Sequence, residues 1–66
     1  RLGETEGVRL ALVLFATQPI VKHERVRALV AGINAMSTEE TYYWYSKCVG
    51  TDGNRARKAL RTLLAD

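Results

Sequence analysis

Four cations near the C-terminus are the side chains best suited to hold a ligand: Arg55, Arg57, Lys58 and Arg61. Cations along a helix can neutralise nucleic-acid phosphates and release their counterions, and arginine can contact a phosphate with two hydrogen bonds. Helical spacing places three of them opposite an apolar stripe of Ala56, Ala59, Leu60, Leu63 and Leu64, with Arg55 at the edge. An ordinary solvated face shows the same pattern, so a protein partner with an incidental basic face stays open.

Catalytic constellations are missing from the sequence. The single histidine, His23, stands among charged residues at a helix start, where a solvated surface side chain is expected. The single cysteine, Cys48, shares a helical face with Trp44 and is interpreted as a buried, inert thiol. These two residues are too few for a zinc site, and the segment 50–53 lacks the ending of a phosphate-binding loop. We expect no enzyme, no metal, no cofactor and no small-molecule substrate.

An aromatic cluster, Tyr42 to Tyr45, admits two interpretations. Exposed aromatic rings can stack on nucleic-acid bases. In so short a chain, Tyr42, Trp44 and Tyr45 are better explained as part of the core. Tyr43 points the other way on a helix, and we expect it to anchor a partner.

The composition is that of one small, mildly basic domain. Its 66 residues carry a net charge of +3 with an isoelectric point near 9.4, which permits a nucleic-acid partner without requiring one. The lone cysteine fits a reducing compartment. The apolar run 10–16 is too short for a membrane span of roughly 20 residues. We expect a cytoplasmic domain over 1–66 that is a piece of a longer protein or a subunit of an assembly.

The first half of the chain predicts two helices. The segment 4–17 contains an apolar run on every face; leucine and alanine favour a helix, although a buried strand over 8–16 stays open. It ends before Pro19 because the residue preceding a proline avoids the helical region. From about Ile20 to Ala35, an apolar stripe at helical spacing predicts an amphipathic helix. Gly32 lies within a second stripe of small residues that would allow a close helix contact.

The second half predicts two more helices. Ser37 and Glu40 have the spacing of a capping box that starts a helix at Thr38 and carries it to about Cys48. After a glycine-containing loop, the last helix runs from about Arg55 to Ala65. This C-terminal pair is a possible helix-turn-helix, although a six-residue loop is longer than usual. The predicted fold is an all-α bundle of four short helices.

The predicted elements offer more apolar surface than they can cover. The first helix is apolar all round and the second has two non-polar stripes, whereas the last two helices have one apolar face each. Large uncovered apolar patches usually mark interfaces. We therefore expect self-association or a protein partner at Leu10, Leu12, Leu14 and Tyr43.

Non-catalytic binding is the function that the sequence favours. A small basic helical bundle is similar in kind to DNA-binding domains and to small helical subunits of prokaryotic nucleic-acid-targeting complexes. That likeness is one of structural class, with no sequence motif behind it, and a shared fold does not imply a shared function. A nucleic-acid module that contacts the phosphate backbone through its last helix is the first hypothesis, and a protein-interaction or oligomerisation domain is the alternative.

Overall fold

The protein is an all-α bundle, as its sequence predicts. The computed structural model describes residues 3–20 and 22–65, and within those residues it contains helices and no strand. Four helices follow one another in the order α1 (Glu4–Thr17), α2 (His23–Asn34), α3 (Thr38–Cys48) and α4 (Gly53–Ala65). None of the helices in this part of the chain has the length and apolar character needed to cross a bilayer.

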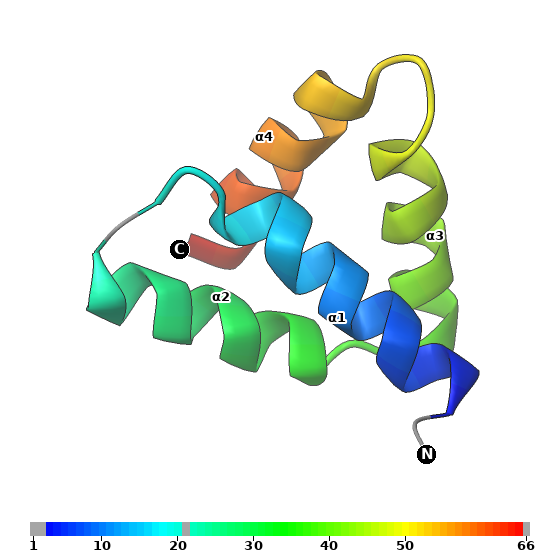
Figure 1. Ribbon diagram of the computed structural model, residues 1–66, viewed down its shortest axis with the longest axis horizontal. Coiled ribbons are helices and arrows are strands. Elements are labelled where there is room, and N and C mark those ends of the chain that lie inside the picture. The colour runs from blue at the N-terminus through cyan, green and yellow to red at the C-terminus, as the bar shows by residue number, and fades with distance from the viewer. Residues whose placement is uncertain (1–2, 21, 66) are drawn as a thin grey trace.

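Helix α1 is the central element of the bundle. It crosses the middle of the molecule and packs against each of the other three helices (Figure 1). Its backbone is helical throughout Glu4–Thr17, which confirms a helix at 8–16 in place of a strand, and Leu12 and Ala16 are fully buried. It ends at Thr17, and Gln18 takes an extended conformation before Pro19, as the steric restriction on that residue predicts.

Helix α2 buries the large apolar stripe that the sequence shows. Leu29 and Ile33 are inaccessible to solvent, and Met36 just beyond the helix is nearly so. The helix begins at His23, three residues after the predicted start. Gly32 permits the close contact that its stripe predicts, because a Cβ atom there would lie 2.8 Å from Cδ2 of Leu64 on α4. The alanines of that stripe are exposed.

Helix α3 has the predicted capping box at its first turn. The Ser37 hydroxyl accepts a hydrogen bond from the Glu40 amide at 3.1 Å, and the Glu40 carboxylate accepts one from the Ser37 amide at 3.0 Å. Thr41 is fully buried, and its hydroxyl donates to the Ser37 carbonyl at 2.8 Å. Both bounds of this helix match the prediction.

Helix α4 begins at Gly53, two residues before the predicted start. The connection from α3 is therefore residues 49–52. A Cβ atom at Gly53 would collide with the backbone carbonyl of Cys48. Only a glycine lets α4 start this close to the end of α3.

Ser37→Ala removes one half of the capping box. The Glu40 amide loses its acceptor, and the free energy of unfolding should fall by about 1 kcal/mol. Thermal unfolding followed by circular dichroism measures the effect, with Thr38→Ala at the neighbouring exposed position as the control. Equal melting temperatures for Ser37→Ala and the wild type would contradict a stabilising cap.

Candidate nucleic-acid interface

The four predicted cations divide into two pairs. Arg55 and Lys58 are exposed, whereas Arg57 and Arg61 are half-buried and face the other helices. The prediction of one outward-facing basic stripe was therefore wrong for Arg57 and Arg61. The buried face of α4 does not coincide with its apolar stripe, because Leu60 is buried while Leu63 is 58% exposed.

Arg57 joins the end of α3 to α4. Its Nη2 donates to the Cys48 carbonyl at 3.2 Å, and its Nη1 donates to the Asn54 side-chain oxygen at 3.3 Å. The guanidinium carbon lies 4.8 Å from the centre of the Phe15 ring, a favourable cation–π geometry. Phe15 in turn stacks on Tyr45 at a ring separation of 6.4 Å.

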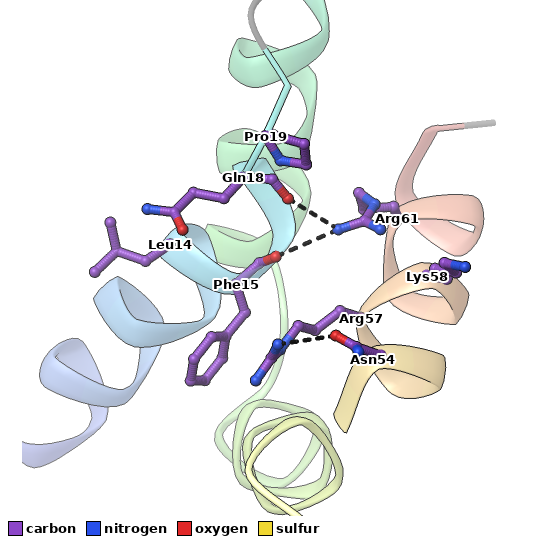
Figure 2. A pocket seen from close by; sticks show the side chains of 8 residues that line it. All are labelled: Leu14, Phe15, Gln18, Pro19, Asn54, Arg57, Lys58 and Arg61. Carbon is purple, nitrogen blue, oxygen red and sulfur yellow. Dashed lines mark hydrogen bonds between the residues drawn. The ribbon is translucent and has the colours of Figure 1, made fainter. Parts of the chain in front are cut away.

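Arg61 closes the end of α1. Its Nη1 donates to the carbonyls of Gln18 at 3.2 Å and Phe15 at 3.5 Å, as the dashed lines in Figure 2 show. Helix α1 has no basic residue in its own last turn. The last carbonyls of a helix lack partners within it and carry negative partial charge, so a cation from another helix is stabilising there. Both bonds use Nη1, and Nη2 and Nε have no hydrogen bond to the described residues.

A pocket of about 350 Å³ opens between the end of α1 and the side of α4 that bears Arg57 and Arg61 (Figure 2). Its lining residues come from these two segments alone and are Leu14, Phe15, Gln18, Pro19, Asn54, Arg57, Lys58 and Arg61. Three are cations, and no carboxylate is among the described residues that line it. The hydrogen-bond partners of both arginines are uncharged oxygens, so no described carboxylate neutralises the positive charge of the pocket.

Sequence reasoning missed the part of this pocket that α1 supplies. Phe15, Gln18 and Pro19 come from a segment that reads as an apolar helix and its end. No local signal connects that segment with α4, some 40 residues later. The i, i+4 spacing of Arg57 and Arg61 was visible, and it does place both side chains on one side of α4.

The other reactive side chains of residues 3–20 and 22–65 form no second centre. Burial raises the pKa of the Cys48 thiol above its ordinary value, and the nearby Arg57 and Arg61, which lower it, do not overcome that desolvation. A protonated, buried thiol is a poor nucleophile. His23 is exposed at the first turn of α2. Within the described part of the chain, no three histidine, cysteine or acidic residues gather as metal ligands.

The predicted partner interface is only partly at the surface. Leu10 and Leu14 are 53% and 58% exposed, and Tyr43 is 55% exposed. Leu12 is fully buried in the core, so its assignment to an interface was wrong. The α1 face that bears Leu12 and Ala16 turns inward, and the face that bears Leu10 and Leu14 turns to solvent.

The predicted aromatic core is also partial. Trp44 and Tyr45 are half-buried and pack against the core, while the fully buried side chains of α3 are Thr41 and Cys48. The burial of Cys48 confirms the prediction for that residue. Trp44 thus retains surface that a ligand can reach.

Arg57→Met should destabilise the protein without changing its fold. Methionine keeps the aliphatic packing but leaves the Cys48 carbonyl without its donor and Phe15 without its cation. Loss of a hydrogen bond from a charged donor costs about 1.5–3 kcal/mol. Denaturant unfolding measures the change, and Lys58→Met, at an exposed position one residue along, is the control. If both variants unfold at the same midpoint, Arg57 is not a structural residue.

Comparison with known proteins gives a family model that matches residues 1–66. No curated protein and no solved structure matches the chain significantly.

Proposed function

The chain belongs to the family described as Domain of unknown function (DUF7680), and from its geometry we propose a non-catalytic module that binds nucleic acid through the phosphate backbone. The pocket between α1 and α4 carries this proposal. Three cations line it, the hydrogen bonds of its two arginines go to uncharged oxygens, and no carboxylate of the described residues lies among them. Such a site attracts anions, and phosphodiester groups are the anions that a row of cations on a helix fits.

The cations have different roles in this proposal. Lys58 is exposed at the pocket rim and contacts phosphate as a mobile point charge. Arg61 offers the nitrogens that α1 does not use, and Asn54 adds a neutral donor. Arg55 extends the basic surface along the outside of α4. Arg57 fixes the start of α4 through its hydrogen bond to the Cys48 carbonyl and adds a positive charge to the lining of the pocket.

The connection between α3 and α4 supports the same proposal. The four residues 49–52 are within the usual turn length of a helix-turn-helix, where the second helix faces the nucleic acid. Helix α4 is the second helix of this pair and carries the basic surface. A cytoplasmic location and a place in a larger nucleic-acid-targeting assembly complete the proposal.

Replacing Arg55 and Lys58 together by glutamate should abolish binding to oligonucleotides at low salt. Both side chains are exposed, so the fold should survive. Fluorescence anisotropy with a labelled oligonucleotide measures the affinity. The neutral double variant Arg55→Gln with Lys58→Gln should flatten the plot of log affinity against log salt by about 0.9 for each lost duplex-phosphate contact.

Arg25→Glu with Arg27→Glu is the matched control for the glutamate pair. It reverses two exposed cations on α2 and changes the net charge equally. If both glutamate pairs weaken binding equally, the attraction is diffuse and α4 is not the site. A wild-type chain that binds no oligonucleotide even at low salt would overturn the proposal.

Self-association is a second candidate function, and one observation favours it. Leu10 and Leu14 lie one turn apart on α1 and are more than half exposed. An apolar groove of about 240 Å³ between α1 and α2 adjoins Leu10. A second copy of the chain would cover this face by a two-fold contact, in which the same patch serves both partners.

Sedimentation of the 66-residue chain at high concentration tests the second candidate. A dimer should form, and Leu10→Glu with Leu14→Glu should convert it to a folded monomer. Leu12→Glu should unfold the chain because that side chain is in the core. A strictly monomeric wild type at millimolar concentration would exclude self-association through this face.

A further inference from the structure

A second groove lies on the other flank of α4, against α3. It measures about 320 Å³ and is lined by Tyr43, Trp44, Lys47, Asp52, Arg55, Ala56 and Ala59. We propose that this groove holds an unpaired base, so that the nucleic acid bound is single-stranded. This inference rests on the proposed function, because the groove orients a strand whose phosphates α4 attracts.

The aromatic pair gives the groove its shape. The rings of Tyr43 and Trp44 lie 5.5 Å apart at 87° to each other. Two perpendicular rings make a corner in which a flat base can stack on one ring while its edge meets the other. Tyr43 is 55% exposed and Trp44 half-buried, so the pair is anchored in the protein and still open to solvent.

Small and charged residues complete the groove. Ala56 and Ala59 leave room beside the rings on the α4 side. Lys47 holds its ammonium group 5.4 Å from the centre of the Tyr43 ring, and Arg55 stands on the opposite helix. Asp52 is the one acid in the lining, and its carboxylate can accept a hydrogen bond from the amino group of a base.

Arg55 connects this groove with the phosphate surface. It lines the groove and lies one turn from Lys58, which lines the first pocket. Residues three apart on a helix are surface neighbours, with Cβ atoms about 5–6 Å apart. A nucleic-acid strand that crosses α4 can place one base in the groove while its phosphates stay in contact with Arg55 and Lys58.

The positive charge around the groove favours a single nucleic-acid strand over other ligands of aromatic grooves. Aromatic grooves also bind proline-rich peptides, but those ligands gain nothing from two flanking cations on a chain of net charge +3. A single strand offers both a flat base for the rings and a phosphate for Arg55 and Lys47. A duplex keeps its bases stacked and paired, and so cannot fill the corner.

Trp44 is the only tryptophan, so fluorescence excited at a wavelength that tyrosine does not absorb reports on this groove. A twelve-nucleotide mixed sequence is titrated into the 66-residue chain as single-stranded RNA, as single-stranded DNA and as a blunt DNA duplex, with binding measured in parallel by anisotropy. Both single strands should quench Trp44, and the DNA and RNA arms then identify the preferred sugar. The duplex should bind through phosphates and leave the Trp44 signal unchanged.

Tyr43→Ala should weaken single-strand binding by about 5- to 150-fold, the range for loss of one base–aromatic stack. Duplex binding should stay the same, and Tyr43→Phe should bind like the wild type because it keeps the ring. Binding of both forms with no change at Trp44 and no effect of Tyr43→Ala would overturn the groove inference and leave the phosphate proposal intact. Absence of any binding by anisotropy would overturn both. Quenching of Trp44 by a proline-rich peptide and by neither single strand would overturn the groove inference alone.

Discussion

Guanidinium groups donate hydrogen bonds to carbonyl oxygens where each of the first three helices ends. Arg9 of α1 reaches the Met36 carbonyl just beyond α2 at 2.8 Å. Arg57 reaches the Cys48 carbonyl at the end of α3, and Arg61 reaches the carbonyls at the end of α1. The last turn of a helix leaves such groups without partners, and α1 and α2 have no basic residue of their own there. Every connection between helices is thus held by an arginine of another element.

This arrangement fits the size of the protein. A chain of 66 residues cannot enclose many side chains, and the fully buried set is correspondingly small. Long arginine side chains extend the packed interior with their aliphatic parts while their charged ends reach the surface carbonyls. The Nε atoms of Arg9 and Arg57 are buried and have no hydrogen-bond partner among the described residues.

The same contacts connect stability with the proposed binding. Because Arg57 and Arg61 donate to uncharged carbonyls, no described carboxylate compensates their charge, and both side chains line the pocket beside α1. A salt bridge in the same place would have stabilised the turn and removed the attraction for anions. Helix α4 therefore separates two surfaces that differ in chemistry, a cationic pocket on one flank and an aromatic groove on the other, with Arg55 and Lys58 on the ridge between them.

The sequence by itself determined the elements whose signals are local. Pro19 ended α1, the capping box of Ser37 and Glu40 started α3, and the larger of the two non-polar stripes of α2 indicated which face packs against the core. The tertiary structure decided the orientation of α4 about its own axis, and therefore which of its side chains face the other helices. Its leucine stripe and its cations repeat with the same helical period, so periodicity alone favours burying the leucines. Carbonyls at the ends of α3 and α1 accept hydrogen bonds from Arg57 and Arg61, which turn inward, and the acceptors of Arg61 lie more than 40 residues away in the sequence.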